Sequence, residues 1–228
     1  MPSHLRVADV DAAPAPALAC DAPMTDKVDF TKALDAYRAP RGAFRVVEVP
    51  ELRYLMVDGR GDPNTAPAFV GAIEALYPVA YRLKFASKRE LGRDYVVPPL
   101  EGLWWSESMD AFTTARDKSR WEWTLMILVP DWIDPELIAR AIAAAGEKRP
   151  PARLGDVRVD ALSEGTCLQS LHVGSFDDEG GVLERLHREA TETRGMRLAG
   201  KHHEIYLSDF RRVTPERQRT ILRQPVTP

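Results

Sequence analysis

The chain has 228 residues, of which 44% are hydrophobic and 29% are charged, and its net charge is −3 at neutral pH. This length and composition are typical of a globular protein with one large domain or two small halves that share a core. The acidic balance argues against a nucleic-acid-binding protein, because neutralising phosphates needs clustered Lys and Arg. No apolar run approaches the ~20 residues that span a bilayer, so no membrane partner is expected.

The first 42 residues are predicted to lie outside the folded domain. Residues 1–23 are rich in Ala and Pro and lack the pattern of a secretion signal, which predicts a disordered leader. A polar segment follows up to residue 42, and a single domain is expected over residues 43–226. Of the two cysteines, Cys20 lies in the leader and Cys167 in the domain, so a disulfide framework is not expected and a reducing, cytoplasmic setting fits.

The first half of the domain, residues 43–130, shows the pattern of a β-hairpin, a helix and two further strands. Hydrophobic periodicity and turn residues place these elements over residues 44–63, 64–91, 94–107 and 119–132. Asn64 or Thr65 can cap the helix, whereas Pro78 should kink or split it. The helix should bury one apolar stripe, formed by Phe69, Ile73, Leu76 and Ala80.

The second half, residues 155–226, repeats this pattern after a connecting helix over residues 134–148. Its hairpin, helix and two strands are expected over residues 154–180, 177–195, 200–209 and 216–226. Each half alone is too small to cover its sheet. Two halves with facing sheets would enclose one core with a cleft between them, which predicts an α+β fold.

The repeat aligns "PPLEGLWW" with "KHHEIYLS", so that Glu101 becomes the counterpart of Glu204. Strand alternation puts Glu204 and Tyr206 on one face, which should point into the cleft if Ile205 and Leu207 pack on the helices. A carboxylate in an aromatic pocket can pair with a cationic ligand or act as a general base on water. For Glu101, a surface position before the Gly turn stays an alternative.

Tryptophans are concentrated near the first of these glutamates. Four of the five fall within residues 104–123, where their rings can stack on flat ligands or simply pack in the core. Alternation leaves open which member of each close pair faces the cleft. Further candidates for lining the cleft are Tyr81, His172 and Met126.

The histidines do not form a recognisable metal site. His202 and His203 are neighbours, so on a strand their side chains point to opposite faces. The sequence has no HExxH motif and no Cys/His spacing typical of zinc sites. A nucleophile elbow and a Gly-rich phosphate loop are also missing. We therefore expect neither a metal nor a cofactor.

Six segments spread over residues 43–226 together resemble the GyrI-like small-molecule-binding family. They are "LYPVAYRLKF", "PPLEGLWW", "WEWTLMILVPDWI", "SEGTCLQSLHVGSFDDE", "GKHHEIYLSDFRR" and "TILRQPV". The resemblance implies an SHS2-type fold of two βαββ units with pseudo-twofold symmetry around a ligand cleft. The family includes effector-binding domains of multidrug-sensing transcription activators and, more similar to this chain, stand-alone hydrolases that open cyclopropane rings. We expect no dedicated nucleic-acid-binding domain here, because no helix-turn-helix pattern precedes the domain.

The family's cleft glutamate lies in an "E-I-Y"-like strand, which Glu204 and Tyr206 match. The segments "LWW" and "WEW" match the cleft walls, so the resemblance implies that Trp105 and Trp123 stack on the ligand. The assignment of Glu101 to the cleft rests partly on the internal repeat, which aligns it with Glu204.

These features predict a protein that binds planar hydrophobic or cationic small molecules, as a monomer or a homodimer. As an enzyme, it would use Glu204, with Glu101, to deprotonate water and hydrolyse electrophilic cyclopropane compounds. Tyr206 would donate a hydrogen bond to the oxygen that gains charge. The alternatives are a module that binds or sequesters drugs without turnover, and an inhibitor that acts on another protein through its surface.

Overall fold

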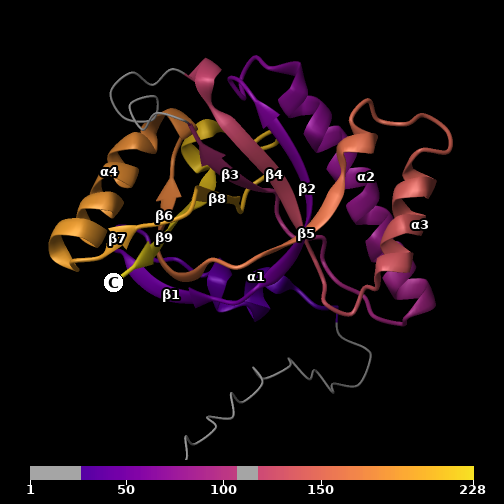
Figure 1. Ribbon diagram of the computed structural model, residues 1–228, viewed down its shortest axis with the longest axis horizontal. Helices are drawn as coiled ribbons and strands as arrows, with labels where there is room; N and C mark the ends of the chain where they lie inside the picture. Colours follow the sequence, from indigo (N-terminus) through magenta and orange to yellow (C-terminus); the bar gives the residue numbers. More distant parts are fainter. Residues whose placement is uncertain (1–26, 107–117) are drawn as a thin grey trace, which may run out of the picture.

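The computed structural model describes residues 27–106 and 118–228, which form one large antiparallel sheet flanked by helices (Figure 1). The strands are β1 (Arg45–Val49), β2 (Leu52–Arg60), β3 (Glu101–Trp105), β4 (Glu122–Val129), β5 (Arg158–Leu162), β6 (Gly165–Val173), β7 (Arg197–Leu198), β8 (His202–Tyr206) and β9 (Arg219–Thr227). Their order is β1-β6-β9-β8-β3-β4-β2-β5, and β7 pairs with the end of β9. The predicted α+β class is confirmed.

The two halves of the sheet have matching strand orders. The first half arranges β2, β3 and β4 around α2 (Pro67–Glu90), and the second arranges β6, β8 and β9 around α4 (Gly180–Arg188). β3 and β8 pair in the middle, so the halves form one continuous sheet. The two facing sheets expected from the repeat are therefore replaced by two half-sheets joined edge to edge.

The short strand before each half crosses to the other half. β1 pairs with β6, and β5 pairs with β2, so neither forms a hairpin with the strand that follows it. Pro50 and Glu51 connect β1 to β2. Tight hairpins need residues such as Asn-Gly that accept positive φ, and this connection lacks them. The expected hairpins are thus exchanged strands that tie the halves together.

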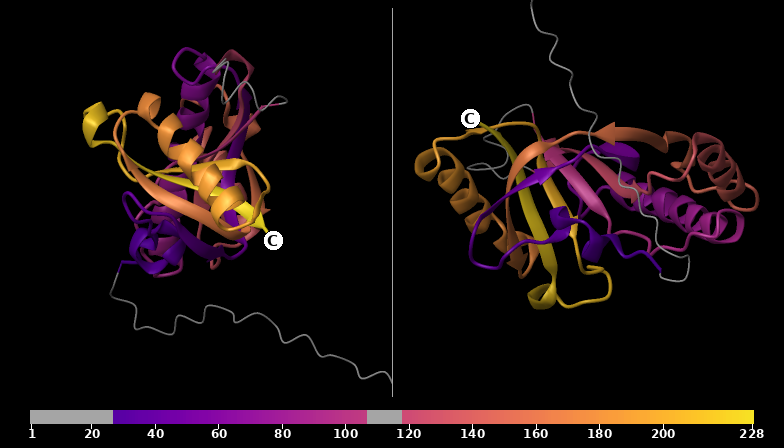
Figure 2. Two further views of the ribbon diagram at one scale, coloured as in Figure 1. Left: turned by 90° about the vertical axis from the view of Figure 1, so that its left-hand side faces the viewer. Right: turned by 90° about the horizontal axis from the view of Figure 1, so that it is seen from below.

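The longer helices cover one face of the sheet. α2 and α3 (Pro135–Ala145) share a hydrophobic core with β2 and β4, whereas α4 packs on β6 and β9. Two perpendicular views place α4 at one end of the molecule and the α2–α3 pair at the other (Figures 1 and 2). No helix within the described ranges is both long and apolar enough to cross a membrane.

Helix α2 differs from its prediction at both expected break points. It continues through Pro78, and Ala66 precedes its first turn without a side-chain cap. The predicted apolar stripe is confirmed, since Phe69, Ile73, Leu76 and Ala80 are all buried. Burial of this stripe on both sides of Pro78 holds the helix together despite the lost backbone hydrogen bond.

The segment before β1 packs against the domain, although the sequence placed it outside. Val28 bridges to Tyr95, and Phe30 in α1 (Phe30–Ala33) stacks on Trp132 with ring centres 5.7 Å apart. Tyr37 is buried on the face of the sheet opposite to α2. The folded unit therefore begins no later than residue 28, and the predicted leader at 1–23 lies outside the described residues.

At Gly59 the core has no room for a side chain. Gly59 pairs with Trp123, whose fully buried ring covers it, and a methyl group added there would lie 2.0 Å from the ring. Gly59→Ala is expected to lower the free energy of unfolding by about 1–3 kcal/mol or more, because the ring has to move within a close-packed core. Urea denaturation measures this loss. Gly155→Ala, which meets no atom within 4 Å, is the control and should unfold like the parent.

Candidate functional site

An aromatic cavity of about 130 Å³ opens on the helix-bearing face, where the two halves of the sheet meet. Its polar lining includes Glu204 from β8 and Lys118 from the segment before β4. Its aromatic lining consists of Phe69, Trp104, Trp121, Phe176, Tyr206 and Phe210. Residues from both halves of the chain thus form one pocket, as the cleft hypothesis requires.

The aromatic rings support one another in two groups. Trp104 lies edge-on to Trp121, with ring centres 5.7 Å apart, and stacks loosely on Phe69 at 6.0 Å. On the other side Phe176, Tyr206 and Phe210 are within 6.0 Å of one another in edge contacts. Such mutually packed rings form rigid apolar walls that can bind a flat ligand.

A chain of hydrogen bonds fixes the carboxylate of Glu204. The Tyr206 hydroxyl donates to Glu204 Oε2 at 2.8 Å and accepts from Trp104 Nε1 at 3.1 Å. Burial and the neighbouring carboxylate raise the pKa of Tyr206 well above its ordinary value, so the hydroxyl keeps its proton and remains a donor. The other carboxylate oxygen, Oε1, lies 3.5 Å from His202 Nε2.

The local sequence explains this geometry. His202, Glu204 and Tyr206 alternate along β8 and therefore share one face. Across the ladder, Gly102 lies opposite Glu204. A side chain at Gly102 would meet Trp104 Nε1 at 2.8 Å and the Tyr206 hydroxyl at 3.0 Å, so the glycine leaves room for their hydrogen bond.

Glu101 does not join Glu204, and its predicted place in the cleft has to be corrected. It pairs with Ile205 and points to the opposite face of the sheet, where it is 1% exposed. There it accepts a hydrogen bond from the Tyr37 hydroxyl and lies 2.9 Å from His203 Nε2. The sequence repeat aligns Glu101 with Glu204, but in the sheet Gly102 lies opposite Glu204. Glu101 is one residue away from Gly102, and neighbouring residues of a strand point to opposite faces.

The network around Glu101 is ionic and almost completely buried. His203 Nδ1 lies 3.0 Å from Glu164, which Arg223 also contacts at 2.8 Å. These side chains are between 0% and 3% exposed. Burial would lower the pKa of His203, but the two carboxylates raise it. Both ring nitrogens lie within 3.0 Å of carboxylate oxygens, and both can donate to them only in the protonated, positively charged form. Two cations and two carboxylates thus balance one another.

Four other candidate residues lie away from the cavity. Trp123 belongs to the core over Gly59, and Met126 is fully buried on the opposite face. Trp105 is also on that opposite face, with Lys201 Nζ 3.2 Å from the centre of its ring. His172 is buried, and its Nε2 hydrogen-bonds the Ser175 carbonyl at 3.0 Å.

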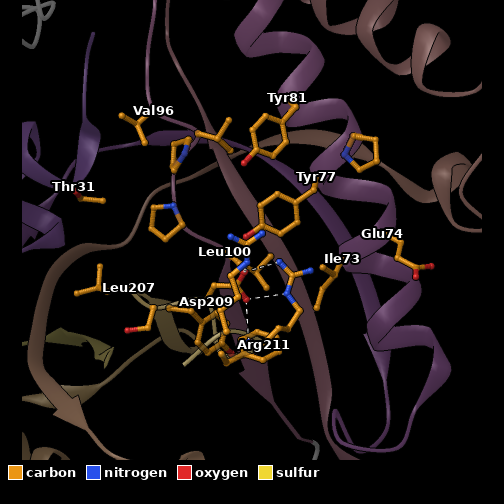
Figure 3. A pocket seen from close by; sticks show the side chains of 18 of the residues that line it. Thr31, Ile73, Glu74, Tyr77, Tyr81, Val96, Leu100, Leu207, Asp209 and Arg211 are labelled. Atoms are coloured by element: carbon orange, nitrogen blue, oxygen red, sulfur yellow. Dashed lines mark hydrogen bonds and ion pairs between the residues drawn. The ribbon is translucent and has the colours of Figure 1, made fainter. Parts of the chain in front are cut away.

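Tyr81 lines a different feature, an open groove of about 690 Å³ beside α2 (Figure 3). Figure 3 shows Tyr77 and Tyr81 projecting from the helix above Arg211, which pairs with Asp209. The groove and the cavity share Tyr206 and Phe210, whose side chains separate them.

Sequence reasoning missed most of the aromatic wall. Trp104 and Trp121 are the members of their pairs that line the cavity. Trp104 pairs with His202, which shares a strand face with Glu204. This pairing identifies Trp104 as a cavity residue, but it can be used only when the partner strand is known. Phe176 and Phe210 follow the ends of β6 and β8, and no periodicity marks such positions.

No group of three or more His, Cys, Asp or Glu side chains in residues 27–106 and 118–228 is arranged to hold a metal ion.

Known proteins share this fold. A model of the GyrI-like small molecule binding domain matches residues 43–226. A hydrolase from Listeria innocua is 36% identical, with a TM-score of 0.76, and the match covers 88% of this chain and 100% of that one. An uncharacterized conserved protein from the same organism is 38% identical over the same shares, with a TM-score of 0.79. The EcmrR C-terminal domain shares the fold, at 12% identity and a TM-score of 0.52, over 81% of this chain and 97% of that one. No curated protein sequence matches the chain.

The buried ionic network predicts how stability depends on pH. Burial would raise the pKa of Glu164, but His203 and Arg223 lower it to about 2, whereas its ordinary value is 4.5. A depressed folded-state pKa contributes stability that is complete above the unfolded value and is lost as the pH falls from about 4.5 towards 2. Glu164→Gln should cost about 3–5 kcal/mol at pH 7, because it leaves buried cations uncompensated.

Urea denaturation between pH 7 and pH 3 measures both effects. The variant should be less stable at pH 7 and should lose less stability than the parent between pH 4.5 and pH 3. The exposed Glu184→Gln on α4 is the control and should follow the parent curve. Parallel curves for parent and Glu164→Gln would contradict the assigned charge of this network.

Proposed function

Because the chain belongs to the GyrI-like small-molecule-binding family, we propose that it binds planar, partly apolar compounds in the aromatic cavity and hydrolyses electrophilic ones, such as those with an activated cyclopropane ring. The carboxylate of Glu204 carries this proposal. It is held by Tyr206 at the wall of a pocket whose lining is mainly aromatic, where a base can meet a flat electrophile. The similarity to a Listeria hydrolase supports an enzymatic role.

The cavity sets the size of the group that enters it. Its volume of about 130 Å³ is close to that of apolar cavities, roughly 150 Å³, that hold one benzene ring. We therefore expect one aromatic or dienone ring to lie between Trp104 and Phe176, with the rest of a larger compound outside. The Lys118 ammonium at the rim, paired with Asp177, favours an oxygen-bearing edge on that ring.

The proposed reaction adds one water molecule across the strained ring. Glu204 Oε1 takes a proton from water, and the water oxygen forms a bond to a cyclopropane carbon. The carbon–carbon bond of the ring breaks, and its electron pair moves through the conjugated system to the carbonyl oxygen. That oxygen takes up a proton from solvent, and Glu204 releases the proton it accepted, so the sum is the addition of one water molecule. No external oxidant or reductant is needed.

This geometry changes the role expected of Tyr206. Its hydroxyl proton is donated to Glu204 rather than left free for a substrate oxygen. Tyr206 therefore acts as a positioning residue that holds Oε2 and leaves Oε1 to meet water. Glu101 has no part in the proposed reaction, because the sheet separates it from the cavity.

A second candidate is binding without turnover. A carboxylate set among aromatic rings also suits a cationic aromatic ligand, since the ring faces and the negative charge both attract it. The two functions differ in stoichiometry. An enzyme consumes many equivalents of a reactive compound, whereas a sequestering protein depletes one equivalent and stops.

The test uses a cyclohexadienone with a spiro-fused cyclopropane, whose dienone absorbance disappears as it opens to a phenol. The parent protein should give multiple turnovers. Glu204→Gln should lower the rate by about 100-fold, the lower end of general-base contributions, because the amide cannot accept the proton. Tyr206→Phe should lower it by about 10-fold, the scale of one hydrogen bond to a charged group.

Glu184→Gln is the matched control and should keep the parent rate. Full activity in Glu204→Gln would rule out its role as the base. A single equivalent consumed by the parent would favour the sequestering function, and isothermal titration with a cationic aromatic compound would then show whether Glu204→Gln weakens binding.

A further inference from the structure

The outer face of α2 carries an exposed apolar stripe. Val70, Tyr81 and Phe85 are 54%, 48% and 50% exposed, the highest values among the exposed large hydrophobic residues of the described chain. Tyr77 extends the stripe, and the rings of Tyr77, Tyr81 and Phe85 stack in sequence with centres 6.3 and 6.4 Å apart. A contiguous exposed stripe of this kind marks an interaction surface rather than scattered surface residues.

The stripe is symmetric about Tyr81. Tyr77 and Phe85 lie four residues before and after it, and Glu74 and Lys88 lie seven residues before and after it. At about 100° per residue, all five positions fall within about 40° of one line along the helix. The apolar members are at the centre, and one end is acidic while the other is basic.

A stripe with this symmetry is complementary to the same stripe of a second copy when the two helices pack antiparallel. With Tyr81 on a twofold axis, Tyr77 faces Phe85 of the partner subunit, and Glu74 faces Lys88 of the partner subunit. The same contacts recur with the roles exchanged, which is the property of an isologous interface. Antiparallel packing thus brings opposite charges together at both ends, whereas parallel packing would oppose like charges.

We propose that two copies of this chain form a homodimer through antiparallel packing of their α2 stripes. The paired contact extends over about 21 Å from Glu74 to Lys88, at 1.5 Å per helical residue. Lys88 is free to turn to the partner subunit, because its present partner, Asp94, is also bound by Lys84 at the shorter distance of 2.7 Å. The stripe also borders the groove that contains Tyr77 and Tyr81, so the second copy forms a wall of that groove.

Sedimentation velocity of the full chain between 5 and 100 µM tests the dimer. The parent should sediment with twice the mass of one chain. Tyr81→Glu should give a folded monomer, because it brings two carboxylates together on the axis. Leu198→Glu on β7, an exposed apolar residue away from the stripe, is the control and should remain dimeric. Circular dichroism shows whether each variant keeps its fold.

A charge exchange tests the register and does not rely on removing an aromatic ring. Glu74→Lys and Lys88→Glu should each weaken the dimer by several-fold in Kd, and the double exchange should restore it. A parent that stays monomeric at 100 µM overturns the proposal. If the single variants weaken the dimer and the double variant does not recover, the antiparallel arrangement is overturned. If the parent is monomeric and Tyr81→Glu instead abolishes binding of an aromatic probe, the stripe belongs to a ligand groove.

Discussion

The antiparallel pairing of β3 with β8 is the contact on which the rest of this molecule depends. It joins the two half-sheets, and its register decides which side chains reach the cavity. Gly102 opposite Glu204 leaves space for the Tyr206–Trp104 hydrogen bond that holds the carboxylate. Because side chains alternate strictly along a strand, a slip of one residue would exchange the contents of the two faces.

The two faces of the central strands have different physical characters. On the helix-bearing face, aromatic rings and the carboxylates of Glu204 and Glu179 line a cavity to which both halves of the chain contribute. On the other face, Glu101, Glu164, His203 and Arg223 form a closed ionic network that the segment containing Tyr37 covers. Buried charges are costly unless each is paired and hydrogen-bonded, and here both ring nitrogens of His203 face carboxylates. The network therefore ties β3, β8 and β9 together on one face, while the opposite face carries the cavity of the proposed site.

Aromatic residues have two distinct uses in this chain. Around Glu204 they are largely buried and support one another from both halves, which makes a rigid pocket that can hold a flat ring. Along α2 they stack in a row and stay exposed, which suits contact with another surface. Phe210 and Tyr206 separate these regions, since they line both the cavity and the groove beside α2. An assembly at α2 would thus lie next to the proposed reaction site.

Local patterns in the sequence were sufficient for the α+β class, the repeated order of elements, the buried stripe of α2 and the shared face of Glu204 and Tyr206. Each of these follows from periodicity over a few neighbouring residues. The sequence did not reveal that β1 and β5 exchange between halves, that Glu101 lies on the opposite face, or that Trp104 and Trp121 rather than Trp105 and Trp123 line the cavity. Those features depend on which strands pair and in what register. Pairing is decided by contacts between residues about 100 positions apart, such as Gly102 with Glu204, and only the tertiary structure brings them together.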